Sequence, residues 1–279
     1  MCILEAIRAM ASESHPVMPS SLEENKREML EAIGADSIDE LYEQIPDRLL
    51  YDGELDLPGP AGEAEVKRKT EDILSKNTTA EENVNFLGAG CWQHYVPAVC
   101  DEIIQRREFL TSEWGSPESD KGRNQAWFEF KSQLGELLDL DAVGMPVYSW
   151  GNANGFAMRM AQRLTGRKEV LVPETISPER LSVMRNYSNL SNDPEDISIT
   201  TIPYDQETGR MDVDALAEQC SEDTAAVYYE TPTYLGTIES NGEAIAEIAH
   251  DNGAECIVGV DPITLGVLES PANHGADIV

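Results

Sequence analysis

The chain has 279 residues, of which 52 are acidic and 20 basic, so its formal net charge at pH 7 is −32. That length can form one large domain or two smaller ones, and the excess of acids disfavours binding to nucleic acid and to anionic membrane surfaces. No apolar run approaches the length needed to cross a bilayer, and residues 1–8 lack the basic start and apolar centre of a signal peptide, so we expect a cytoplasmic protein.

The acidic side chains are spread over the amphipathic segments instead of being collected in one tail. A charge of this size destabilises the compact state by self-repulsion unless salt screens it. Arginine also outnumbers lysine among the few basic residues. We interpret the composition as that of a halophile, with an ordinary acidic protein as the alternative.

The five cysteines lie at positions 2, 91, 100, 220 and 256 and never form a Cys-x-x-Cys pair. The sequence therefore predicts neither a metal site nor a disulfide framework. Cys100 and Cys256 stand in apolar patterns, so we expect both to be small core residues.

The first part of the chain predicts an extension followed by a helical arm. We interpret residues 1–17 as an extension outside the folded unit, with Met18 as an alternative start. Residues 18–84 are expected to form an N-terminal helical arm and linker, since their helices have thin apolar faces and must dock on something larger. The proline- and glycine-rich stretch 46–62 predicts the linker, and residues 63–76 predict a helix after it.

Two capping-box patterns mark the start of helices in this arm. Ser20 and Ser21 each stand three residues before a glutamate and predict a helix that ends at Gly34. The pair Ser37 and Glu40 predicts a second, shorter helix.

Residues 85–279 are predicted to form a large α/β domain. Its first loop, residues 85–97, joins glycines and aromatics to His94, which either serves as a ligand or base or anchors the loop. Residues 147–155 form a Gly/Asn/Ser-rich turn before a helix. Such a turn can bind an anion at the helix N-terminus or can cap the helix without binding anything.

From there strands and helices alternate, which predicts βαβ units and a mostly parallel sheet. The predicted strands are residues 170–172, 197–202, 225–229 and 256–260. Residues 276–279 read as the start of another strand, so we expect a truncated chain.

The run Cys256–Val260 is unbroken by polar residues and is closed by Asp261 and Pro262. Such a run predicts a strand covered on both faces, and ligands bind at the carboxyl ends of strands in these sheets. Asp261 can therefore pair with a cationic ring nitrogen, bind a metal, or simply cap the next turn.

Several segments together resemble a known family, in family order from about residue 20 onward. They are Glu28–Gly34, Ser37–Tyr42, Asn85–Gly90 with His94–Val99, Phe128–Phe130, Val260–Gly266 and Gly275–Val279. The chain resembles subunit 1, the N-terminal half, of the glycine-decarboxylating P-protein of the glycine cleavage system (glycine dehydrogenase, aminomethyl-transferring).

The resemblance implies a fold-type I pyridoxal-phosphate architecture, with a mostly parallel seven-stranded sheet, flanking helices and an N-terminal helical arm. It implies a partner, subunit 2, that carries the Schiff-base lysine and the pyridoxal phosphate. It also implies that the assembled enzyme decarboxylates glycine and passes the aminomethyl group to the lipoyl arm of H-protein. The cofactor would supply the electron sink and the protein the orientation.

The family's motifs are only partly present. Asp261 matches the aspartate that faces the pyridine nitrogen in catalytic relatives, but residues 148–152 lack the Asp and Thr of the family's Tyr-Asp-Gly-Ala-Thr loop and place Trp150 at a usual glycine. Residues 114–118 keep only the final Pro-Glu of a Pro-Tyr-Gln-Pro-Glu motif. We therefore expect no catalytic residue, metal or cofactor on this chain itself.

The residues expected to line a site are Asp261, His94, Glu118 and Gln125. Two other functions stay open at this point. One is a free-standing fold-type I pyridoxal-phosphate lyase or aminotransferase, and the other is a non-catalytic scaffold relative.

Overall fold

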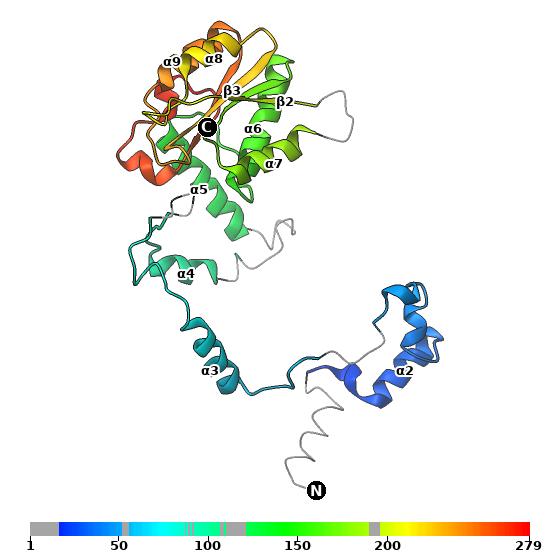
Figure 1. Ribbon diagram of the computed structural model, residues 1–279. Helices are drawn as coiled ribbons and strands as arrows, with labels where there is room; N and C mark the ends of the chain where they lie inside the picture. Colours follow the sequence, from blue (N-terminus) through cyan, green and yellow to red (C-terminus); the bar gives the residue numbers. More distant parts are fainter. Residues whose placement is uncertain are drawn as a thin grey trace. The chain divides into compact units, whose positions relative to one another are not determined.

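The computed structural model describes residues 17–51, 56–86, 88, 90, 92–106, 109, 121–189 and 196–279. The chain divides into two compact units, Met1–Thr78 and Thr79–Val279, and each is described by itself (Figure 1). The sequence-based boundary at residue 85 lies a few residues beyond this division.

The first unit contains short helices joined by extended chain. Its α-helices are α2 (Glu23–Ile33) and α3 (Glu63–Leu74), and its 3-10 helices are Pro19–Ser21, Asp39–Tyr42 and Asp47–Leu49. The four elements that follow Pro19–Ser21 have no buried side chain. That agrees with the thin apolar faces expected from the sequence.

The predicted capping boxes are realised only in part. The N-cap of α2 is Leu22, whose apolar side chain cannot accept a hydrogen bond from the helix. Ser21 belongs to the preceding 3-10 helix, and its hydroxyl donates to the Met18 carbonyl at 2.7 Å. Gly34 ends α2 in the left-handed conformation, with φ of 77°. This is the conformation that favours glycine, as predicted.

The second box forms around a 3-10 helix instead of an α-helix. The Ser37 hydroxyl accepts the Glu40 N–H at 3.4 Å, and the Glu40 carboxylate accepts the Asp36 N–H at 3.2 Å. The side chains therefore satisfy free amides at the start of a single short turn.

The second unit is built on a parallel sheet. The described residues contain four strands, β1 (Glu169–Pro173), β2 (Ser198–Ile202), β3 (Thr224–Thr231) and β4 (Glu255–Val260), in the order β2-β1-β3-β4. All paired strands are parallel, as predicted. Ile278 forms a parallel bridge with Ile257, and its carbonyl accepts the Val258 N–H at 2.8 Å, so residues 276–279 begin to pair with β4 as expected.

Six α-helices accompany this sheet in the described part of the unit. They are α4 (Ala98–Ile104), α5 (Lys121–Leu138), α6 (Trp150–Thr165), α7 (Pro178–Ser188), α8 (Val213–Gln219) and α9 (Gly242–Asp251). Two 3-10 helices, Pro262–Gly266 and Pro271–His274, follow β4. None of the helices in the described residues is long and apolar enough to cross a membrane.

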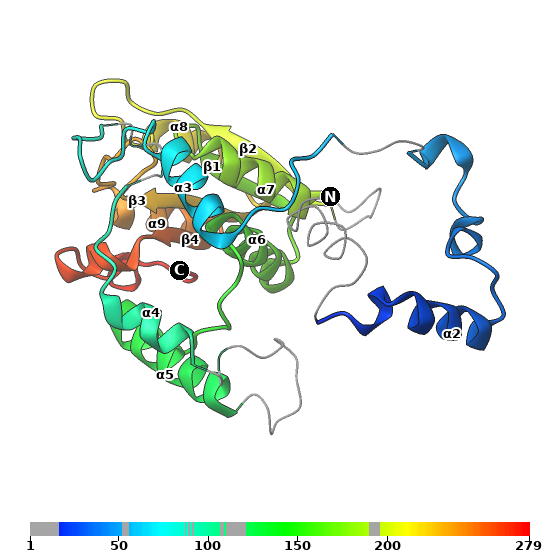
Figure 2. The same ribbon diagram turned by 90° about the horizontal axis from the view of Figure 1, so that it is seen from below.

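Alternate residues of each strand point to opposite faces of the sheet, and each face has its own core. Leu171, Val227 and Val258 pack with α8 and α9, whereas Val172, Tyr228 and Ile257 pack with α6 and α7 (Figures 1 and 2). The sheet is therefore covered on both sides at β1, β3 and β4, which explains the apolar runs in these strands. The edge strand β2, Ser-Ile-Thr-Thr-Ile, is only partly buried.

The prediction that Cys100 is a core residue is wrong. Cys256 is buried in β4, but Cys100 is exposed on α4, together with Val99 and Ile104. The apolar pattern of α4 correctly indicates an apolar face, but no other described part of this chain covers that face.

Candidate functional site

A pocket of about 540 Å³ lies at the carboxyl end of the parallel sheet. Its wall combines the residues that follow β3 and β4 with the start of α6 and with Phe86, Gly88, Trp92 and His94. It is lined by Phe86, Gly88, Trp92, His94, Trp150, Pro232, Thr233, Tyr234, Leu235, Gly236, Asp261 and Thr264. Because ligands of parallel α/β sheets bind at this edge, we take this pocket as the candidate functional site.

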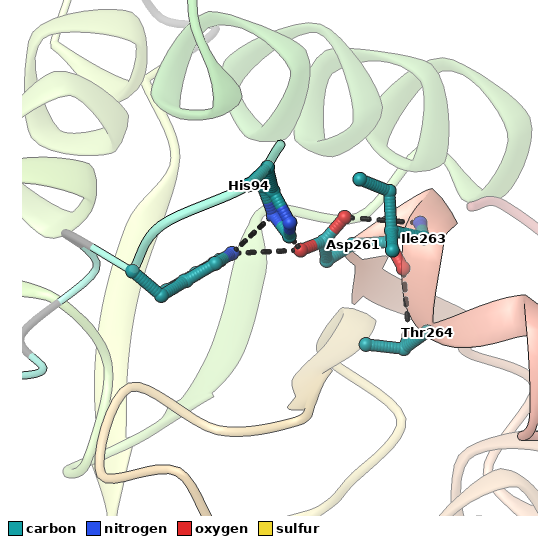
Figure 3. Close-up of polar contacts among 5 residues, drawn as sticks. His94, Asp261, Ile263 and Thr264 are labelled. Carbon is teal, nitrogen blue, oxygen red and sulfur yellow. Dashed lines mark hydrogen bonds and ion pairs between the residues drawn. The ribbon is translucent and has the colours of Figure 1, made fainter. Parts of the chain in front are cut away.

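Asp261 directly follows β4 and caps the turn after it (Figure 3). Its Oδ1 accepts the Ile263 N–H at 3.1 Å, and the Thr264 hydroxyl donates to the Asp261 carbonyl at 2.6 Å. The capping role considered from the sequence is therefore present. It uses one carboxylate oxygen and fixes the direction of the other.

The second oxygen of Asp261 meets two ring nitrogens. Oδ2 lies 3.0 Å from His94 Nε2 (Figure 3), and it accepts the Trp92 Nε1–H at 2.8 Å. Trp92 Nε1 is also 2.8 Å from His94 Nε2. Indole is only a donor, so with an unprotonated His94 Nε2 the Trp92 N–H is shared between two acceptors, that nitrogen and Asp261 Oδ2. In the other tautomer His94 Nε2–H donates to Oδ2.

Trp150 forms the adjoining wall and opens α6. Ser149 caps this helix, since its Oγ accepts the Asn152 N–H at 3.2 Å. The capping alternative for the turn 147–155 is thus present, and it occupies one of the amides that an anion would need. Trp92 packs edge-on against Trp150, with 6.4 Å between ring centroids and an interplanar angle of 88°.

A buried network of polar and charged side chains contacts Trp150 through Arg180. The Arg180 guanidinium carbon lies 3.6 Å from the centroid of the Trp150 ring, and Arg180 Nη1 lies 2.6 Å from Glu230 Oε2. The Tyr228 hydroxyl donates to Glu230 Oε1 at 2.7 Å and accepts from Asn154 Nδ2 at 2.9 Å. Burial, and then the Glu230 charge, raise the pKa of Tyr228 well above its usual range, so this hydroxyl stays protonated as a donor.

The structure brings together two of the four residues expected to line a site. Asp261 and His94 meet, although 167 positions separate them in the chain. Gln125 lies on α5, where its amide donates to Glu129 at 2.9 Å, and it does not line the pocket. Glu118 lies outside the described residues.

Sequence reasoning did not single out several residues that build the site: Trp92, Arg180, Glu230, Tyr228 and Asn154. One signal for them was available, because Glu230 is a lone acid in the apolar run that forms β3. A buried carboxylate requires a cationic or hydrogen-bonding partner, but the sequence does not say which arginine provides it.

The residues around Asp261 do not fit a pyridoxal-phosphate ring in the position that the resemblance implies. Oδ2 already has Trp92 and His94 as partners, and a Cβ on Gly259 would lie 2.8 Å from Trp150 Nε1, so the indole covers the end of β4. No lysine is among the pocket-lining residues that the structure describes. We therefore derive no cofactor chemistry from this pocket.

No set of three or more His, Cys, Asp or Glu side chains in the described residues is placed to hold a metal ion. Asp261 and His94 thus form a pair of polar groups beside aromatic rings.

The fold of the second unit is that of fold-type I pyridoxal-phosphate enzymes. The structure of Oryza sativa TDC with PLP shares this fold at a TM-score of 0.54 and 13% identity, over 94% of this chain and 62% of that one. A solved glycine decarboxylase (P-protein) of the glycine cleavage system, in inhibitor-bound form, matches at a TM-score of 0.76 and 33% identity, over 95% of this chain and 56% of that one.

Within that class, the chain belongs to the glycine cleavage system P-protein family, whose model matches residues 17–279. Probable glycine dehydrogenase (decarboxylating) subunit 1 of Pyrococcus horikoshii is 43% identical over 258 residues, which are 91% of this chain and 56% of the relative. The protein of the same name from Aeropyrum pernix is 40% identical over 273 residues, or 95% of this chain and 58% of the relative. The chain thus spans a little over half the length of these relatives.

Proposed function

We propose that this chain is subunit 1 of the glycine decarboxylase of the glycine cleavage system and that it is active only together with a subunit 2. The observation that carries the proposal is its 43% identity, over 91% of its length, to a protein named as such a subunit. The assembled enzyme decarboxylates glycine with pyridoxal phosphate and transfers the aminomethyl group to the lipoyl arm of H-protein.

In this proposal the cofactor is bound by subunit 2. The site at Asp261 supports this division, because Trp92 and His94 already contact the carboxylate oxygen that a ring nitrogen would need. Trp150 also covers the strand end at Gly259. This chain then contributes an interface and a wall of the shared site, and it supplies neither nucleophile nor base.

Exposed apolar side chains of the second unit support a protein partner. Phe156, Met160 and Leu164 lie on one side of α6 and are each at least 45% exposed. A groove of about 660 Å³ between α5, α6 and β4 is lined mainly by apolar residues, Phe156 and Met160 among them. Contiguous apolar surface of this kind marks interaction sites, and we propose that subunit 2 covers it.

We propose a cytoplasmic enzyme whose partners are two proteins, subunit 2 and lipoylated H-protein. The net charge of −32 bears only on other classes of partner. Nucleic acid and anionic membranes are unsuited to such a field, since both repel acidic surfaces.

The test is glycine–bicarbonate exchange with H-protein and added pyridoxal phosphate, in high salt. Subunit 1, the candidate subunit 2 and their equimolar mixture are assayed in parallel. We expect exchange in the mixture alone. Exchange by subunit 1 on its own would instead identify a free-standing pyridoxal-phosphate enzyme, and a rate for the mixture no higher than that of subunit 2 would identify a scaffold relative.

A further inference from the structure

We infer that the Trp92 indole is a built-in occupant of the site at Asp261, so that this chain carries a self-filled pocket for a planar heteroaromatic N–H donor. Removing the indole is expected to open a binding site that selects such rings. This inference goes beyond the proposed function, because it assigns a role to Trp92 that holds whether or not the chain takes part in glycine decarboxylation.

The first support is the contact between Trp92 and Asp261. A ring N–H meets a carboxylate oxygen at 2.8 Å, across 169 positions of sequence, so tertiary packing and not local geometry creates the contact. The Asp261 side chain is 12% exposed. A carboxylate this buried needs donors, and Trp92 supplies one in the way that a bound heteroaromatic ring would.

The second support is that other rings hold the Trp92 indole at its edges. His94 lies 6.5 Å away and Trp150 lies 6.4 Å away, measured between ring centroids, and both are perpendicular to Trp92 at 88°. Edge-to-face contacts of this kind are favourable and directional. Two aromatic rings therefore border the part of the indole that is not exposed to solvent.

The third support is that Trp150 is itself fixed. Arg180 covers its face, with 3.6 Å from the guanidinium carbon to the ring centroid, and the buried Glu230 carboxylate holds Arg180 at 2.6 Å. A Cβ on Gly259 would lie 3.1 Å from Trp150 Cζ2, so the backbone of β4 confines the ring from another direction. Because Trp150 cannot easily move into the space that Trp92 fills, and because Trp92 is 41% exposed, loss of its side chain should leave a cavity that opens into the pocket beside Asp261.

The cavity would have a defined chemistry. Asp261 Oδ2 would keep its contact with His94 and lose the hydrogen bond from Trp92. Trp150 would remain as an aromatic wall of the cavity. The ligand class that fits is a planar heteroaromatic ring with one N–H donor, for which indole is the simplest probe.

The experiment uses Trp92→Gly in the complete chain, with folding checked by circular dichroism, and titrates indole by calorimetry. Indene, which has the shape of indole and no N–H, is the matched ligand control. We expect indole to bind the variant at least about tenfold more tightly than indene, because a hydrogen bond to a charged group is lost with indene. In wild type and Trp92→Phe a ring keeps this position beside Asp261, so neither protein should bind indole in preference to indene.

The inference is overturned if folded Trp92→Gly fails to bind indole, or binds indole and indene equally. A second measurement, made on the wild-type chain, tests the inference even if Trp92→Gly does not fold. In wild type the Trp92 indole N–H should exchange with solvent at least about tenfold more slowly than in Asp261→Asn, with Trp92→Phe used to assign its NMR signal. Equal exchange rates would also overturn the inference. None of these readouts involves glycine turnover, so this inference and the proposed function fail separately.

Discussion

Arg180 and Glu230 form a buried ion pair, with 2.6 Å between Nη1 and Oε2, and this pair supports the aromatic wall of the pocket. Both side chains are less than 10% exposed. One residue comes from α7 and the other from the end of β3, so the pair joins a covering helix to the sheet at the functional edge. The same guanidinium stacks on Trp150, which links the stability of the core to the shape of the site.

We expect Glu230→Gln to lower the free energy of unfolding by about 3 kcal/mol or more, because the change leaves the Arg180 charge buried and unpaired. The measurement is urea unfolding followed by circular dichroism. The double variant Arg180→Met with Glu230→Gln should lose less than the sum of the two single changes.

The matched control for this prediction is Glu243→Gln, which removes an exposed carboxylate 3.4 Å from His274 Nδ1. It should change stability by less than about 1 kcal/mol. Equal losses for Glu230→Gln and Glu243→Gln would show that the buried pair does not stabilise the fold.

Gly155 allows α6 to pack closely on α7. A Cβ at this position would lie 2.6 Å from Tyr187 Cδ2, so Gly155→Ala must displace the ring. We expect a loss of about 1–3 kcal/mol from overpacking, measured by thermal or urea unfolding. Gly144→Ala, at a position where a Cβ meets nothing within 4 Å, should cause no loss. A Gly155→Ala variant as stable as Gly144→Ala would contradict the packing seen here.

The elements of the sheet were predictable because burial on both faces leaves a direct trace in the sequence. Strands β1, β3 and β4 read as apolar runs, and β4 ends at Val260, directly before Asp261, as the run Cys256–Val260 indicates. The helix α4 shows the limit of this reasoning. Its periodic pattern says that one face is apolar, but not whether this chain covers it, and Cys100 on that face is exposed.

Individual residues of the candidate site could be predicted from the sequence, but the contacts between them could not. Asp261 and His94 each carried a local signal, one at a strand end and the other in a glycine-rich loop. That Trp92 completes their contact depends on how the loop packs on the sheet, which no local pattern encodes. Arg180 was missed for the same reason, since its partner Glu230 is 50 positions away.

The exposed Cys100 and the buried Cys256 should differ in reactivity toward alkylating agents. Burial, followed by the Asp277 charge, raises the pKa of Cys256 to about 12, while Cys100 is exposed. The thiolate is the nucleophile, so iodoacetamide at about pH 8 should alkylate Cys100 and react with Cys256 roughly a thousandfold more slowly. Mass spectrometry of the native chain measures both rates, and denatured chain provides the control in which they converge. Comparable native rates would show that Cys256 is accessible.

The acidic surface predicts that salt stabilises the fold. With a net charge of −32, self-repulsion falls as salt shortens the screening length. We expect the melting temperature to rise by about 5 °C or more between about 0.1 M and about 2 M KCl. Sucrose, which stabilises by exclusion from the surface and screens nothing, is the control. A melting temperature that rises in sucrose but not in KCl would contradict the halophile interpretation of the composition.

Glu255 predicts a pH dependence with a definite sign. Burial and the Asp277 charge raise the pKa of Glu255 above its ordinary value of 4.5, against a smaller opposing effect of His250. The folded state therefore binds this proton more tightly than the unfolded state, and ionisation of Glu255 costs stability as the pH rises past that ordinary value. Glu255→Gln removes the cost, so it should stabilise the protein at pH 7, by less than about 1 kcal/mol since the group is partly exposed.

Below about pH 4 the carboxyl group is protonated in both states, so the gain from Glu255→Gln should disappear there. Urea midpoints of variant and wild type between about pH 4 and pH 8 measure this difference. Any neutralised acid relieves some repulsion in so acidic a chain, and Glu247→Gln, on the exposed side of α9, gives the size of that general effect. If Glu255→Gln gains no more than Glu247→Gln at pH 7, or keeps its advantage at pH 4, the Glu255 carboxylate is not the source of the pH dependence.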